Sequence, residues 1–148
     1  MLIGLACTMA VAVTGCSNVD TRAGTETANA VFADLQNIVT ASLGEWDNLI
    51  SEESGRFCEP SKRKAIWHQS RWDFNASGRP TEDGLPLLNQ AEDYLRNRSD
   101  LIKMDPRADF GAGDSIGAIL KNDVRVYVER PNDVGERPFI VEVIGPCR

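Results

Sequence analysis

Hydrophobic positions in the first half of the chain have helical spacing. From Val31 to Ile50 the apolar side chains recur three, four and seven residues apart, with polar side chains between them. This stripe consists of Val31, Leu35, Ile38, Val39, Leu43, Trp46, Leu49 and Ile50. Thr25 or Thr27 can cap the start of such a helix, and the polar run 51–55 ends it. The spacing therefore predicts a helix that extends to about residue 50.

Apolar and polar side chains alternate between residues 64 and 77, which indicates a strand. One face of this strand would carry Ile66, His68, Ser70, Trp72 and Phe74, and the other Trp67, Gln69, Arg71 and Asp73. Helical spacing returns between residues 85 and 95, and Pro86 is tolerated there because it falls in the first turn. We therefore expect a strand followed by a second helix.

The last third of the chain has the pattern of short strands. Polar turns separate four segments that are apolar or alternating, at residues 101–104, 116–120, 124–129 and 139–144. Short turns between strands are typical of an antiparallel meander, which can leave one face of the sheet in water. We therefore predict an α+β fold, an antiparallel sheet of about four or five strands with two helices packed on one face.

The first fifteen residues carry no charge, and eleven of them are hydrophobic. Such an apolar run has the length of a secretory signal peptide and is too short to cross a bilayer core of about 30 Å as a helix. It ends in Val13-Thr14-Gly15-Cys16. These residues resemble the lipobox of bacterial lipoproteins, in which an aliphatic residue and two small ones precede the lipidated cysteine. The resemblance implies that residues 1–15 are removed and that Cys16 carries a diacylglyceryl thioether.

A lipid on Cys16 would place the protein at the extracytoplasmic face of the cell membrane. Two or more acyl chains, at about 0.8 kcal/mol per buried methylene, make a stable anchor. The polar segment 16–27 is then typical of a flexible tether, and residues 28–148 of a single α+β domain. The alternatives are an ordinary signal peptide, and a buried apolar strand that happens to contain a cysteine.

Two cysteines remain once Cys7 is removed and Cys16 is lipidated. In an exported protein, Cys58 and Cys147 would most simply form one disulfide bond. The two positions lie 89 residues apart, and the loop-entropy model gives such a bond at most about 4 to 5 kcal/mol of stabilisation. The alternative is a catalytic thiol, which needs a nearby base, and the chain has a single histidine, His68.

The order of these features resembles that of a known family. The chain combines a lipobox, a first helix, a cysteine before the first strand, a helix between strands, and a last strand ending in Val143-Ile144-Gly145-Pro146-Cys147. This order is similar to that of the small LppA-like lipoproteins of actinobacteria. The resemblance covers residues 16–148 and implies an extracytoplasmic location and an α+β shape. It implies no activity and no catalytic residues.

Acidic residues exceed basic ones by 22 to 16, and the net charge of −6 argues against a nucleic-acid partner. Basic residues cluster around the strand predicted at 64–77. Together with a tryptophan on the polar face of that strand, they form the candidate binding surface, which we assign to Lys62, Arg63, Lys64, Trp67 and Arg71. The alternatives are contact of these bases with anionic lipid headgroups, and a surface patch that pairs with the acidic first helix.

The segment Gly113–Gly117 matches the G-x-S-x-G pattern of serine hydrolases, with Ser115 as the nucleophile. That motif requires a helix after the serine and a histidine later in the chain, whereas here a strand follows and His68 comes first. No spacing of cysteine, histidine or carboxylate residues predicts a metal or cofactor site. We therefore expect a non-catalytic lipoprotein that binds an envelope partner or a small ligand. The alternatives are a small serine hydrolase that uses Ser115 and His68, and a purely structural envelope protein.

Overall fold

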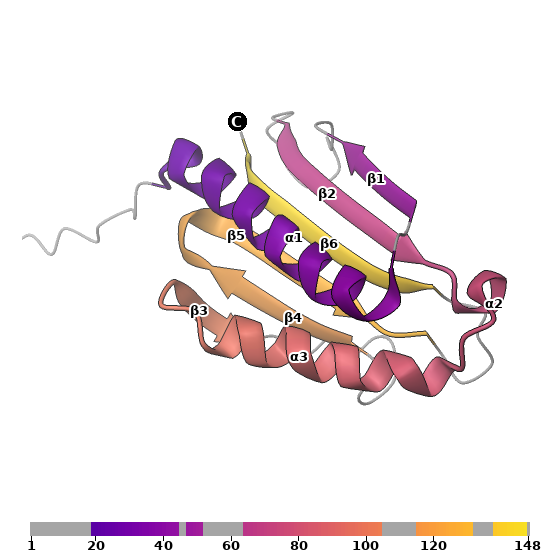
Figure 1. Cartoon of the computed structure of the whole chain (residues 1–148). Coiled ribbons are helices and arrows are strands. Elements are labelled where there is room, and N and C mark those ends of the chain that lie inside the picture. Colours follow the sequence, from indigo (N-terminus) through magenta and orange to yellow (C-terminus); the bar gives the residue numbers. More distant parts are fainter. Residues whose placement is uncertain (1–18, 45–46, 52–63, 105–114, 132–137, 148) are drawn as a thin grey trace, which may run out of the picture.

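The computed structural model describes residues 19–44, 47–51, 64–104, 115–131 and 138–147. These residues form an antiparallel sheet with helices on one side (Figure 1). In chain order the elements are α1 (Thr21–Leu43), β1 (Asp47–Ser51), β2 (Ala65–Trp72), α2 (Phe74–Ser77), η2 (Thr81–Asp83), α3 (Gly84–Arg96), β3 (Leu101–Met104), β4 (Ser115–Leu120), η4 (Lys121–Asp123), β5 (Val124–Glu129) and β6 (Phe139–Cys147). The strand order across the sheet is β1-β2-β6-β5-β4-β3.

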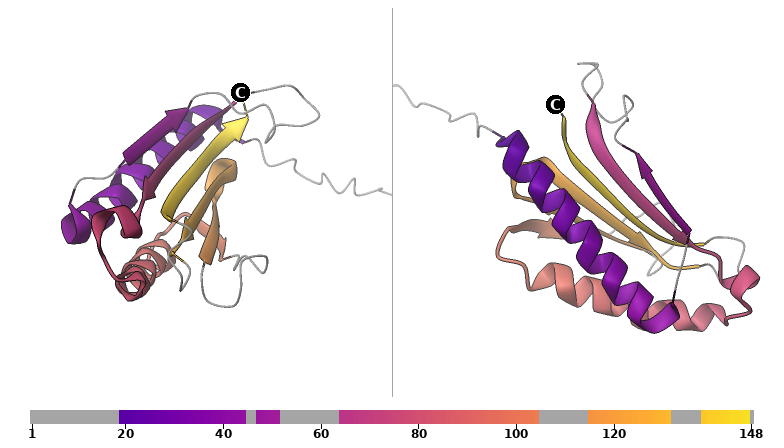
Figure 2. Two further views of the ribbon diagram at one scale, coloured as in Figure 1. Left: turned by 90° about the vertical axis from the view of Figure 1, so that its right-hand side faces the viewer. Right: turned by 45° about the horizontal axis from the view of Figure 1, so that its top comes forward.

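Both long helices, α1 and α3, lie on the same face of the sheet (Figures 1 and 2). Helix α1 packs mainly on β6, and α3 contacts β3, β4 and β5. Each pair of neighbouring strands is antiparallel. The prediction of an α+β fold with two helices on one face of an antiparallel sheet is confirmed. Within the described residues the sheet has six strands, because residues 47–51 form a strand instead of the end of the first helix.

The hydrophobic core lies between the sheet and these two helices. In β5, Val126 and Val128 are 0% exposed, and the register places them beside Val143 and Val141 of β6. The helices contribute buried aliphatic side chains, among them Val31, Leu35 and Val39 of α1 and Leu88 and Leu95 of α3. Because side chains alternate across a strand, every second residue of β5 and β6 points toward the helices.

The predicted strand and second helix are both present. In β2, Ile66, Ser70 and Trp72 are buried, as the alternation of the sequence predicts. Helix α3 begins at Gly84 and holds Pro86 in its first turn. Phe74 lies beyond the strand, in the short helix α2, and its side chain is nevertheless part of the same core at 1% exposure.

Helix α1 begins earlier than the sequence pattern indicates. Asp20 caps it, because one carboxylate oxygen of Asp20 accepts a hydrogen bond from the Ala23 N–H at 3.0 Å. The Asp20 N–H in turn donates to Oδ1 of Asn122 at 3.3 Å. The prediction of a flexible tether over 16–27 is therefore wrong from Thr21 onward. Capping and a tertiary contact stabilise a helix in a segment whose threonines and glycine are weak helix formers.

Helix α1 also ends earlier than predicted. Gly44, with φ at 87°, adopts a left-handed conformation that glycine reaches without strain, and it ends the helix after Leu43. Residues 47–51 then pair with β2, and Ile50 lies opposite His68. The prediction of a helix to residue 50 is wrong because adjacent apolar residues fit a strand as well as a helix, and pairing with β2 decides between them.

Candidate functional site

The sheet face that lies away from α1 and α3 is the candidate site, and we call it the open face. The residues that alternate with the core form it: Trp67, Gln69 and Arg71 of β2, Arg125, Tyr127 and Glu129 of β5, and Ile140, Glu142 and Ile144 of β6. No helix of the described residues covers this face (Figure 2). Strand β2 is distant in sequence from β5 and β6, and the sheet thus brings aromatic, amide and charged side chains of all three strands onto one surface.

The centre of the open face holds a carboxylate. Glu142 is 8% exposed, and its Oε2 accepts a hydrogen bond from Nε2 of Gln69 at 2.9 Å. The register places Gln69 on one side of Glu142 and Tyr127 on the other. Burial of a carboxylate without a donor is strongly unfavourable, so the amide of Gln69 is part of what allows Glu142 to occupy this position.

A small apolar cluster lies beside Glu142, toward the start of β2. Ala65 and Ile144 are buried there, and the half-buried side chains of Trp67, Tyr127 and Cys147 pack against them. Part of the Trp67 side chain remains accessible to solvent. An aromatic side chain that is partly accessible and has polar neighbours is typical of protein interfaces.

The structure describes three of the five residues predicted to form the binding surface. Trp67 and Arg71 lie on the open face, and Arg71 is exposed. Lys64 is exposed immediately before β2, whereas Lys62 and Arg63 lie outside the described residues. The prediction missed Tyr127 and Glu142, because their alternation in β5 and β6 is visible in the sequence but the strand order β2-β6-β5 is not.

One of the four cysteines, Cys147, lies in the described part of the chain. Cys147, the last residue of β6, is disulfide-bonded, and the register places it opposite Ala65 at the start of β2. Cys58 and Cys16 lie outside the described residues, as does the signal peptide expected at 1–15. The pairing of Cys58 with Cys147 and the lipid on Cys16 therefore stay predictions.

His68 lies on the helical side of the sheet. Its ring stacks on Phe32 of α1 with the ring centroids 4.9 Å apart. Its Nε2 lies 2.7 Å from Oδ1 of Asn29, also in α1. Both contacts connect β2 to α1, so the imidazole helps to hold the helix against the sheet.

The two residues of the serine hydrolase alternative are not brought together. Ser115 lies opposite Glu129 in the register and so belongs to the open face, whereas His68 lies opposite Val143 of the core. The strands β6 and β5 also lie between the two residues, a separation of about 14 Å at 4.8 Å per strand. A nucleophile and its base need hydrogen-bond contact, which this arrangement does not provide.

A hydrogen-bonded group between the two helices, which we call the Tyr94 cluster, was not predicted from the sequence. The Tyr94 hydroxyl donates to Oδ2 of Asp34 at 2.7 Å and accepts from Arg98 at 2.6 Å. Burial of the phenol, and then its bond to Asp34, raises the pKa of Tyr94 to about 12. Arg98 donates two bonds of 2.8 Å to Asp100, which lower the pKa of that carboxyl. The cluster joins α3 to α1 through a neutral phenol.

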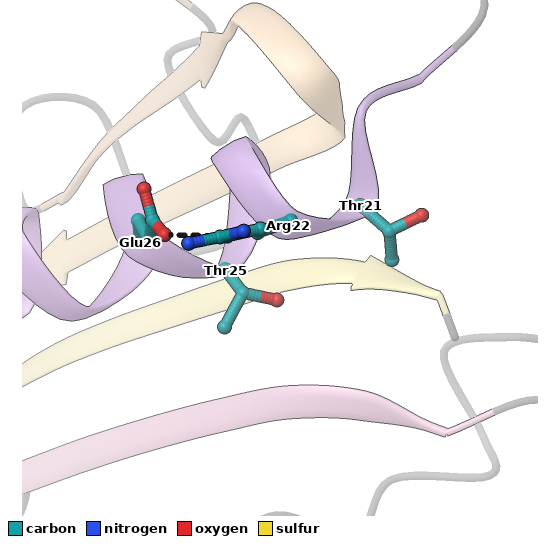
Figure 3. Close-up of a pocket in the computed structure, with 4 residues that line it drawn as sticks. All are labelled: Thr21, Arg22, Thr25 and Glu26. Carbon is teal, nitrogen blue, oxygen red and sulfur yellow. Dashed lines mark hydrogen bonds and ion pairs between the residues drawn. The ribbon is translucent and has the colours of Figure 1, made fainter.

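A pocket of about 510 Å³ lies beside the first two turns of α1 (Figure 3). Thr21, Arg22, Thr25 and Glu26 line it. Nε of Arg22 donates to Oε1 of Glu26 at 3.1 Å, and the two side chains are 90% and 66% exposed. The two charges pair with each other at the surface, where such a pair contributes little, and we assign no ligand to this pocket.

Within the described ranges, no three His, Cys, Asp or Glu side chains are grouped so that they could hold a metal ion. In the same part of the chain, every helix is too short or too polar to cross a bilayer. Comparison of the chain with models of protein families, with curated proteins and with solved structures finds no match. The resemblance to LppA-like lipoproteins therefore stays a prediction.

Proposed function

We propose that the protein is a lipid-anchored binding protein without catalytic activity, which presents the open face of its sheet to a protein partner in the cell envelope. The difference between the two sheet faces carries this proposal: helices cover one face, while the other offers Trp67 and Arg71 to solvent. Tryptophan, tyrosine and arginine are the residues most enriched among strong contributors to protein interfaces.

The proposed location is the extracytoplasmic face of the cell membrane, with the lipid on Cys16. Two features support it. One is the resemblance of Val13–Cys16 to a lipobox. The other is the disulfide bond at Cys147, because such bonds persist in exported proteins and are rare in the cytosol.

The serine hydrolase is not retained as a second function. It would need contact between Ser115 and His68, and these residues lie on opposite faces of the sheet. Nor does any feature of the described residues favour a purely structural role over binding, whereas a partly exposed Trp67 and an exposed Arg71 on the same sheet face favour binding. A binding protein is the function that this surface supports best.

The anchor is tested with a Cys16→Ala variant expressed in the bacterium that produces the protein. The wild-type protein should be found in the membrane fraction, with a lipid mass on Cys16. The variant should leave that fraction or remain unprocessed, while a Cys7→Ala variant should behave as the wild type. Unchanged fractionation of Cys16→Ala would contradict the proposal.

The open face is tested by placing a photo-crosslinking amino acid at position 67, with a matched control at Asn37, which is exposed on α1. A defined adduct should form from position 67 and not from position 37. The captured protein is then purified, and its Kd should rise at least about tenfold, or about 1.4 kcal/mol, with Arg71→Glu. Arg96→Glu, a charge reversal on α3, should leave the Kd unchanged. Equal adducts, or equal effects of the two reversals, contradict the proposal.

A further inference from the structure

We infer that the end of the domain at which α1 begins lies directly against the bilayer, and that the opposite end points away from it. We call the first the membrane end; it comprises the first turn of α1, η4 and the last residues of β6. The partner of this surface is the layer of phospholipid headgroups. The inference rests on the proposed lipid on Cys16 and adds an orientation to it.

The length of the tether sets the distance from the bilayer. Cys16 precedes Thr21, where α1 begins, by five residues. A fully extended chain spans at most about 3.6 Å per residue, so Cys16 and the start of α1 are at most about 18 Å apart. Helix α1 has 23 residues and is about 34 Å long at 1.5 Å per residue. The tether is therefore shorter than the domain, whereas a tether that extended through residue 27 would reach about 43 Å.

The first turn of α1 is fixed to the rest of the domain, so the tether does not readily lengthen by unwinding. The Asp20 N–H donates to Oδ1 of Asn122 in η4. Gly24 approaches η4 and β6 so closely that a Cβ there would lie 2.7 Å from the Asn122 carbonyl oxygen and 2.7 Å from Cγ of Pro146. Glycine permits this approach because it has no side chain. The point of attachment thus belongs to the rigid part of the domain.

The negative charge of the helical layer disfavours an orientation in which α1 and α3 face the bilayer. The helical layer formed by α1, η2 and α3 carries six acidic and two basic side chains, and Asp34 and Asp93 are exposed there. Bacterial membranes that contain anionic lipids repel such a surface. At the membrane end, the exposed Lys64 and Lys121 are offset by Asp20 and Asp123. Anionic lipid therefore repels this end less than it repels the helical layer, and tether length decides between the two ends of the domain.

Three positions distinguish the possible orientations. Lys121 marks the membrane end. Glu82 of η2 marks the opposite end on the helical side, because Gly84 packs against Pro131, just beyond the end of β5. Arg71 marks the same distal end on the open face, because it pairs with Ile140, which in turn pairs with Glu129.

The experiment measures the distance of each position from lipid headgroups. The full lipidated chain, with a nitroxide on Lys121→Cys, Glu82→Cys or Arg71→Cys, is reconstituted in vesicles of phosphatidylcholine and phosphatidylglycerol that contain a nickel-chelating lipid. Relaxation of the nitroxide should be several-fold stronger at 121 than at 82 or 71. High salt should not remove the difference, because a covalent tether is not screened.

Any other result overturns the inference, and the pattern of relaxation shows which part of it is wrong. Equal relaxation at 121 and 71 means that the domain lies on its open face, and equal relaxation at 121 and 82 means that it lies on its helices. Loss of the difference in high salt means that charge, not tether length, sets the orientation. In these three cases the protein still sediments with the vesicles and the anchor stands. Protein that remains in the supernatant instead overturns the anchor and the orientation together.

A lengthened tether provides the matched variant. A flexible Gly-Ser insert of about twenty residues between Asn18 and Val19 has a root-mean-square span of about 25 Å and should remove the difference between positions 121 and 82. The same insert after Arg148 should leave the difference intact. A difference that survives the longer tether overturns the inference, because tether length would then not decide the orientation.

Discussion

The two faces of the sheet differ in what holds them in place. On the inner face, Val126, Val128 and Val143 are 0% exposed beneath two helices. On the open face, the apolar cluster contains two buried residues of the described chain, Ala65 and Ile144, and polar, aromatic and aliphatic side chains share the rest of the face, among them Glu142, Tyr127 and Ile140. Burial stabilises at about 25 cal/mol per Å² of apolar surface, so folding depends mainly on the inner face. One side of these strands therefore provides most of the stability, and the opposite side forms the proposed binding surface.

Replacement of an inner-face aromatic residue should have the largest effect on stability. Phe139 is 0% exposed and stacks on Phe74 with ring centroids 6.4 Å apart. We expect Phe139→Ala to lower the free energy of unfolding by about 3 to 5 kcal/mol, measured by urea denaturation. Trp67→Ala on the open face should lower it by about 1 to 2 kcal/mol, because the Trp67 side chain is only partly buried. Equal losses would show that the open face contributes as much to folding as the core.

Removal of the predicted disulfide should have the second largest effect on stability, since this bond would hold the open-face cluster covalently. We expect Cys58→Ser and Cys147→Ser each to lower the free energy of unfolding by about 3 kcal/mol. The double variant should lose no more than either single one, because both remove the same bond. Non-reducing peptide mass analysis should find the two cysteines joined. Additive losses, or a different partner for Cys147, would contradict the pairing.

Disturbing the close contact of Gly24 at the start of α1 should have a smaller effect on stability. A methyl group at Gly24 would clash with the Asn122 carbonyl and with Pro146. We expect Gly24→Ala to destabilise by about 2 kcal/mol, because overpacking outweighs the gain of about 1 kcal/mol in helix propensity. Ala30→Gly, at an exposed position of the same helix, should lose about 1 kcal/mol by propensity alone. A stabilised Gly24→Ala variant would contradict the contact.

The Tyr94 cluster should give the smallest effect, with a characteristic pH dependence. We expect Tyr94→Phe to destabilise by about 1 kcal/mol, because the bond to Asp34 is partly exposed to solvent. The raised pKa of Tyr94, about 12, means that the folded protein keeps a proton that the unfolded chain loses near pH 10. Stability of the wild type should therefore fall as pH rises from about 10 to about 12. This slope, measured by urea denaturation, should be reduced in Tyr94→Phe; an unchanged slope would contradict the assignment.

Local patterns predicted those elements whose formation depends on nearby residues. The alternation around Trp67 and Arg71 correctly placed both side chains on the polar face of β2. The ends of α1 were not predictable in this way, because the contact between Asp20 and Asn122 spans 102 residues and β1 forms only by pairing with β2. Tyr127 and Glu142 joined the candidate site for the same reason, since strand order makes them neighbours.

The sequence by itself determined the α+β class, the periods of the two long helices, and the alternation that separates core from surface in β2 and β5. These features depend on residues a few positions apart, whose spacing is fixed by backbone geometry. Tertiary structure alone decided which strands are neighbours, that Ser115 and His68 lie on opposite faces, and that α1 begins at Thr21. These features depend on contacts between distant segments, and the free energy of such contacts exceeds local propensity.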